Sequence, residues 1–203
     1  PNPFWGCGFA DKIPTVMMSV SSQNSKYSQF SKSLKSRMFE TLNNMKYISV
    51  RDTWTLNMMK AIGVNQDVKV TPDPVFAFNY NAGHLVPSED DIRKRFSLPK
   101  DYVLVSLHSQ SLTLKTLDDL NSMFKAAGKT CVAFPMPGGV MYQHHFDYEI
   151  KVPLSSIDWY ALIKYASGYV GSNMHPIIVS LHNAVPCFSI DHWGTKDFFN
   201  RTV

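Results

Sequence analysis

Two basic side chains stand where a phosphate or a carboxylate could be bound. Arg51 directly follows a run of strand-forming residues, 47–50, and His175 lies within residues 171–176 (GSNMHP). A guanidinium offers forked donors that match a carboxylate or a phosphate. An imidazole titrates near neutral pH, so it can bind an anion and also transfer a proton. Both residues are therefore candidates for an anion site with acid–base chemistry.

His175 has two interpretations. Proline is favoured at the first helical position, so Pro176 predicts a helix with His175 at or beside its N-cap. Free backbone N–H groups and the helix dipole favour an anion at that place. A histidine there can equally cap the helix or pack beneath a loop, and position alone favours neither interpretation.

Arg51 also has two interpretations. At the carboxyl end of a strand it can bind an anionic ligand, or it can form a structural salt bridge with Asp52 or Asp73. Lys196 follows the last expected strand and is a candidate for a third cation, although a solvated lysine is the simpler interpretation of that residue alone.

Other polar residues follow the remaining expected strands. In open parallel sheets, ligands bind beyond the carboxyl ends of the strands. We therefore expect one crevice to receive Arg51, His175 and the pairs Ser109 and Gln110, Ser172 and Asn173, and Asp191 and His192. The adjacent pair His144 and His145 lacks useful metal-ligand spacing and is interpreted as a loop feature, so no metal site is expected.

These positions depend on an alternation of strands and helices along the chain. Strands are expected at residues 14–20, 47–50, 68–70, 102–108, 130–134, 169–170 and 187–190, and helices at 31–46, 52–63, 88–96, 113–127, 155–166 and 175–182. The alternation predicts an α/β fold with parallel strands and right-handed crossovers, in two Rossmann-like units. The loop-rich stretch 72–88 is the expected boundary, which gives domains 1–82 and 83–203.

Composition narrows the function classes. The chain has 203 residues, of which 44% are hydrophobic, and this suffices for a substantial core. The net charge of +4 slightly favours an anionic ligand, but the basic residues are too scattered for a nucleic-acid surface. The apolar runs are too short for a transmembrane segment, and no signal peptide is visible. Three separated cysteines indicate a reducing compartment, so we expect a cytoplasmic protein.

Several segments together resemble the polysaccharide pyruvyl transferase family. They are residues 48–52 (ISVRD), 71–76 (TPDPVF), 159–166 (WYALIKYA), 171–176 (GSNMHP), and 185–186 before the last strand. Their order and separation fit the family across most of the chain. The resemblance implies a glycosyltransferase-B-like pair of Rossmann-like domains. It also implies transfer of the pyruvyl group of phosphoenolpyruvate to two hydroxyls of a sugar, as a cyclic ketal.

The resemblance also implies roles for single residues. It places Arg51, His175 and Lys196 on the phosphate and carboxylate of the donor, with His175 as the catalytic acid and no cofactor. Ser172 and Asn173 are expected to bind substrate beside them, and Asn173 stands where the family has an arginine. The family's glycine-rich opening segment and closing helices are not found, so we expect the chain to be truncated at both ends.

Two other functions fit the same pattern. A nucleotide-sugar-dependent glycosyltransferase would hold a diphosphate at the helix N-terminus and would need a carboxylate for the ribose, for which Asp191 is the nearby candidate. A non-catalytic relative that binds a sugar or an anion is suggested by Asn173 and by the missing end segments.

Overall fold

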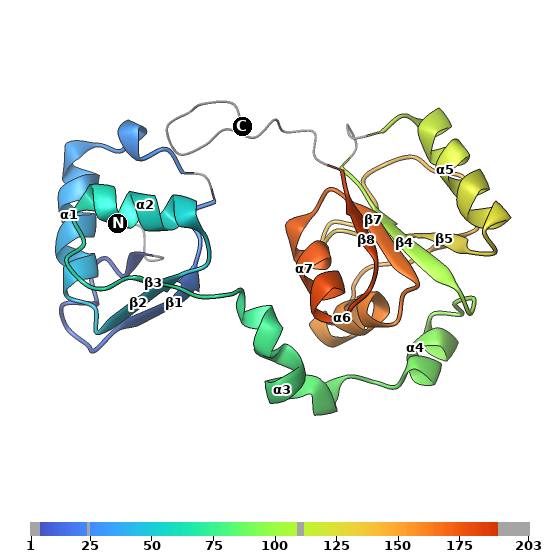
Figure 1. Cartoon of the computed structure of the whole chain (residues 1–203), viewed down its shortest axis with the longest axis horizontal. Coiled ribbons are helices and arrows are strands. Elements are labelled where there is room, and N and C mark those ends of the chain that lie inside the picture. Colours follow the sequence, from blue (N-terminus) through green and yellow to red (C-terminus); the bar gives the residue numbers. More distant parts are fainter. Residues whose placement is uncertain (1–4, 24, 109–111, 191–203) are drawn as a thin grey trace. The chain divides into compact units, whose positions relative to one another are not determined.

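The computed structural model describes residues 5–23, 25–108 and 112–190, which form two compact units that divide between Pro74 and Val75 (Figure 1). Each unit has its own parallel sheet and its own core. The sequence placed the boundary between residues 82 and 83. In the structure, Val75 and Phe78 already pack against the core of the second unit, where the Phe78 ring centroid lies 4.3 Å from that of Tyr160.

The first unit is a three-stranded parallel sheet with the order β1 (Val16–Val20), β2 (Tyr47–Val50), β3 (Lys69–Val70). Helices α1 (Lys32–Asn43) and α2 (Thr53–Ile62) make the crossovers, and a 3₁₀ turn, η2 (Tyr27–Gln29), precedes α1. The strands and helices predicted here are confirmed, because their signals are local.

Helix α2 shows how local those signals are. The Asp52 carboxylate accepts a hydrogen bond from the Thr55 N–H at 2.6 Å and caps the first turn. Gly63 ends the helix in the left-handed conformation, with φ of 89°, as a glycine C-cap should. Between these two signals, Met58 and Ile62 are buried in the core of the first unit.

The stretch 72–88, predicted to be a loop, is largely helical. It contains η3 (Pro74–Ala77), α3 (Phe78–Ala82) and η4 (Gly83–Leu85). The prediction is wrong because tertiary contacts stabilise these short turns: the Tyr160 hydroxyl donates to the Asn79 side chain at 3.0 Å. Glycine and asparagine are frequent in loops, so their presence in this stretch led to the loop prediction, and the contact with Tyr160 could not be foreseen from the sequence.

The second unit is a five-stranded parallel sheet with the order β6 (Tyr148–Glu149), β5 (Thr130–Ala133), β4 (Tyr102–Ser106), β7 (Gly168–Gly171), β8 (Cys187–Ser189). The prediction of parallel sheets is therefore confirmed for both units. β4 lies in the middle and is buried along its whole length. Two details differ from the prediction: β4 ends at Ser106, not at residue 108, and β6 was missed because two residues carry no alternating pattern.

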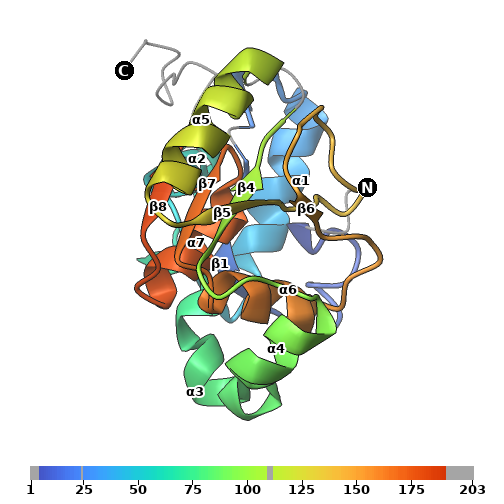
Figure 2. The ribbon, with the colours of Figure 1, turned by 90° about the vertical axis from the view of Figure 1, so that its right-hand side faces the viewer.

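Helices cover both faces of this sheet. One face packs against α5 (Leu114–Ala126), and the other packs against α4 (Glu89–Arg95), α6 (Ser156–Lys164) and α7 (Met174–His182) (Figures 1 and 2). The alternation of β4 explains this layering, since Leu104 belongs to the core beneath α6 and Val105 to the core beneath α5. No helix within the described residues is long and apolar enough to cross a bilayer.

Cys131 on β5 gives a direct test of this core. Its side chain is 1% exposed, and burial raises the pKa of the thiol to about 11. We expect iodoacetamide at pH 8 to leave Cys131 unmodified in the folded protein and to modify it after unfolding in urea, because the thiolate is the reactive form. Peptide mass spectrometry measures the labelling, with the partly buried Cys187 as the internal control. Equal labelling of both thiols in the folded protein would contradict the described packing.

Candidate functional site

Polar groups meet at the carboxyl ends of β4 and β7 in the second unit. The two strands pair up to Ser106 and Gly171. Beyond that pair, the His108 N–H donates to Ser172 Oγ at 3.2 Å, and Asn173 Nδ2 donates to Ser106 Oγ at 3.4 Å. These five residues, here called the strand-end cluster, bring the predicted substrate-binding residues Ser172 and Asn173 together against the end of β4.

Gly171 makes this arrangement possible. A Cβ atom at this position would lie 2.5 Å from the Ser106 backbone oxygen and 2.2 Å from the Tyr169 hydroxyl. The first of these neighbours is backbone and cannot move aside without separating the strands. A residue without a side chain is therefore required where β7 leaves the sheet.

The Tyr169 hydroxyl is buried beneath the same turn. The residue is 1% exposed, and its oxygen has no hydrogen-bond partner within the described residues, although Ser106 and Asn173 lie beside it. Burial raises the pKa of Tyr169, and the neighbouring Ser106 and Asn173 offset that rise only in part. The phenol therefore stays neutral and adds no charge to the cluster.

Helix α7 begins at Met174, with Asn173 as its N-cap residue. The prediction that Pro176 occupies the first helical position, with His175 at or next to the N-cap, is therefore wrong, since His175 and Pro176 are the second and third helical residues. Proline is tolerated at the third position because N–H groups of the first turn need no partner within the helix. The Asn173 side chain makes no cap hydrogen bond, and its Nδ2 donates to Ser106 Oγ.

His175 is exposed on the first turn of α7. Its side chain neither caps the helix nor packs beneath a loop, which were the structural interpretations of this residue. An exposed imidazole beside the free N–H groups of a helix start can meet an anion from solvent. The arrangement is suited to binding a phosphate or a carboxylate and to passing a proton to it.

In the first unit, Arg51 follows β2 and forms an ion pair with Asp73. The side chains are 17% and 8% exposed, so the pair is largely buried. The Arg51 N–H donates to the Val20 oxygen at 3.0 Å, and the Thr71 N–H donates to the Val50 oxygen at 2.8 Å. Arg51 therefore lies at the carboxyl end of this sheet, as predicted, and its salt-bridge interpretation is the one that the structure shows directly.

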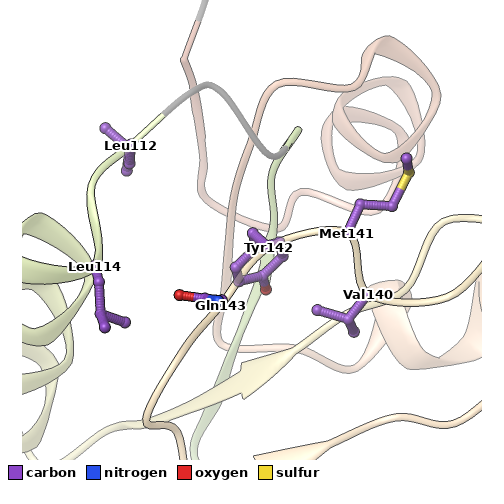
Figure 3. A pocket seen from close by; sticks show the side chains of 6 residues that line it. All are labelled: Leu112, Leu114, Val140, Met141, Tyr142 and Gln143. Carbon is purple, nitrogen blue, oxygen red and sulfur yellow. The ribbon is translucent and has the colours of Figure 1, made fainter.

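A cavity in the second unit was not found by sequence reasoning. Its volume is about 640 Å³, and it lies between the start of α5 and the loop 140–143 (Figure 3). The lining residues are Leu112, Leu114, Val140, Met141, Tyr142 and Gln143. They carry no motif, and the two segments are separated in sequence. Only the general rule that ligands bind beyond strand ends could have directed attention to the loop after β5.

One family model covers all the residues that the structure describes. A family model with the description polysaccharide pyruvyl transferase matches residues 4–194. The chain belongs to the polysaccharide pyruvyl transferase family. No curated protein matches it. The resemblance seen in the sequence is thus confirmed, and membership indicates a transferase of polysaccharide biosynthesis with a saccharide acceptor.

In this pyruvyl transferase family member, the Asn173 amide donates to Ser106 Oγ and so links the start of α7 to the end of β4. Lys196, and also Ser109, Gln110, Asp191 and His192, lie outside the described residues. Arg51 belongs to the first unit and His175 to the second.

The paired histidines lie in the loop after β5, as interpreted. His144 Nε2 lies 3.3 Å from a Glu149 carboxylate oxygen, and its Nδ1 accepts from the Phe146 N–H at 3.1 Å. His145 pairs with Asp118 at 3.0 Å. Across the residues that the structure describes, no group of three or more His, Cys, Asp or Glu side chains could hold a metal ion.

The strand-end cluster can be tested through Gly171. We expect Gly171→Ala to lower the free energy of unfolding by about 1–3 kcal/mol, because a well-packed site must deform to accept a methyl group. Urea denaturation measures the change. Gly138→Ala is the matched control, since a Cβ there meets nothing within 4 Å. The double variant Gly171→Ala/Tyr169→Phe should stay destabilised, because the Ser106 oxygen remains 2.5 Å away. Equal stability of the Gly171 and Gly138 variants would contradict the close contact.

Proposed function

We propose that this chain transfers the pyruvyl group of phosphoenolpyruvate to two hydroxyls of a saccharide and forms a cyclic ketal. The observation that carries the proposal is the exposed His175 on the first turn of α7, within a chain of the pyruvyl transferase family. The proposal includes a glycosyltransferase-B-like arrangement of two Rossmann-like domains, for which the two parallel-sheet units are the support. Three free cysteines fit a cytoplasmic location.

The proposed reaction requires three chemical events. The methylene carbon of phosphoenolpyruvate gains a proton, a sugar hydroxyl captures the cation at the adjacent carbon, and phosphate leaves before the second hydroxyl closes the ketal. In the proposal, His175 supplies the proton, because an imidazole ordinarily titrates near neutral pH. The start of α7 and the cations Arg51 and Lys196 stabilise the charge that grows on the departing phosphate.

Ser172 and Asn173 would orient the donor. The Ser172 oxygen already accepts from the His108 backbone, so its own hydroxyl hydrogen is available to a ligand oxygen. Asn173 holds the start of α7 against β4 through Ser106 and thereby fixes the place of His175. Neither residue brings a charge, so the donor's negative charge depends on the cations and on the helix terminus.

The donor class can be tested by thermal shift. A ligand that binds the folded state raises the melting temperature by mass action. We expect phosphoenolpyruvate to do so and UDP-sugars to have no effect. A rise with UDP-sugars alone would favour a nucleotide-sugar-dependent glycosyltransferase and overturn the proposed donor.

The role of His175 predicts a specific pair of variants. His175→Ala should lower turnover by roughly 10²–10⁴, the usual range for losing a general acid. His175→Gln should bind phosphoenolpyruvate nearly normally, because an amide keeps a hydrogen bond to the anion, and should lose turnover to a similar extent. Phosphate release in the presence of a saccharide acceptor measures turnover. The exposed His84 is the matched control, and His84→Gln should be unaffected. Normal turnover in His175→Gln would show that another residue donates the proton.

The Arg51–Asp73 pair predicts a second set of effects. Arg51→Ala should weaken phosphoenolpyruvate binding by about 1.5–3 kcal/mol, the scale of charged hydrogen bonds. It should also lower stability, because it leaves the Asp73 carboxylate buried without its cation. Asp73→Asn should lower stability but keep binding, since the guanidinium remains. Calorimetry and urea denaturation separate the two effects. Unchanged affinity in Arg51→Ala would assign Arg51 to the salt bridge alone.

A further inference from the structure

We propose that the cavity between the start of α5 and the loop 140–143 binds a neutral pyranose ring of the saccharide acceptor. The inference rests on the proposed function, because it assigns a place to the second substrate of that reaction. The cavity volume of about 640 Å³ falls within the range of roughly 300–1,000 Å³ that small-molecule sites occupy.

The side chains that line the cavity favour an uncharged ligand. None of its six side chains is ionised at neutral pH: Leu, Val and Met residues supply apolar surface, Tyr142 supplies a ring, and Gln143 supplies an amide. Among the described lining residues, a phosphate or carboxylate would meet no cation to pair with. We therefore assign the cavity to a neutral molecule, unlike the anionic donor.

The same lining matches the two surfaces of a sugar. A pyranose has an apolar face of C–H groups and a rim of hydroxyls that both donate and accept. Gln143 is exposed, and its amide makes no hydrogen bond in the part of the chain that the structure describes. In Figure 3 it extends from the loop toward the side on which Leu114 lies. Its oxygen and its NH₂ group can therefore serve neighbouring hydroxyls of one ring.

The loop is held in place without a ligand. The Tyr142 hydroxyl donates to the Val105 oxygen at 2.6 Å, which fastens the loop to the end of β4. Next along the loop, the His144 ring stacks on Phe146 with centroids 5.0 Å apart and contacts Glu149 through Nε2. A site that is ordered beforehand loses little conformational entropy on binding.

The cavity and the strand-end cluster flank the same strand. The Val105 oxygen accepts from Phe134 on the β5 side at 2.7 Å, whereas the next oxygen, that of Ser106, accepts from Ser172 on the β7 side at 3.2 Å. The loop that lines the cavity is bonded to the Val105 carbonyl through Tyr142, and the strand-end cluster is bonded to the Ser106 carbonyl through the Ser172 N–H. A neutral acceptor in the cavity and an anionic donor at α7 would thus approach the end of β4 from its two sides.

The test is saturation-transfer NMR on the intact protein with methyl glycosides of glucose, galactose and mannose, with and without phosphoenolpyruvate. At least one glycoside should receive saturation on its ring C–H protons. Gln143→Ala should weaken that binding about two- to tenfold, as expected for loss of neutral hydrogen bonds, and should leave phosphoenolpyruvate affinity unchanged. Gln29→Ala, at an exposed glutamine of the first unit, is the matched control and should change neither affinity.

The outcomes separate this inference from the proposed function. Phosphoenolpyruvate binding without saturation of any glycoside, or glycoside binding unchanged in Gln143→Ala, would overturn the cavity assignment and leave the donor proposal standing. Glycoside binding that depends on Gln143, without phosphoenolpyruvate binding, would support the cavity and overturn the donor. Octyl glucoside serves as a further probe in the same experiment. Saturation of its alkyl chain alone would show that the cavity takes an apolar group, and would overturn the assignment to a pyranose.

Discussion

At the end of β4, the backbone oxygen of Ser106 lies close to the place where a side chain on Gly171 would have to be. Because Gly171 has no side chain, β7 pairs with β4 up to its last residue, and Ser172 can turn to accept from the His108 backbone. Asn173 then reaches back to Ser106 as α7 begins. The position of the exposed His175 is therefore set by a steric condition on strand pairing four residues earlier.

Local signals allowed most of this fold to be predicted from the sequence, and tertiary contacts or ambiguous local signals explain the errors. Asp52 and Gly63 bound α2 through groups within a few residues of each helix end, so the helix could be placed from the sequence. The start of α7 was misplaced because proline is tolerated at the third helical position as well as the first, so Pro176 alone does not fix where the helix begins. Strand-end logic placed Arg51 correctly, but it could not choose the salt bridge with Asp73 over a free guanidinium, since that choice depends on where the chain returns after β3.

The side chains at the start of α7 bring little fixed charge. The uncharged amide of Asn173 bonds to Ser106, beside the neutral phenol of Tyr169. On the proposed function, the negative charge of the donor would therefore be met by the start of α7 and by the cations Arg51 and Lys196.

A reaction between an anionic donor and a neutral acceptor needs two subsites of different polarity that meet at one place. Consecutive carbonyls of a strand point to opposite neighbours. At the end of β4, the Val105 carbonyl accepts from the Tyr142 hydroxyl of the loop 140–143, whereas the Ser106 carbonyl accepts from the Ser172 N–H just before α7. If the two proposed subsites are correct, their difference in polarity follows from which segment contacts each of these two adjacent residues. A change in the loop after β5 would then alter acceptor selectivity and leave the contacts at the start of α7 in place.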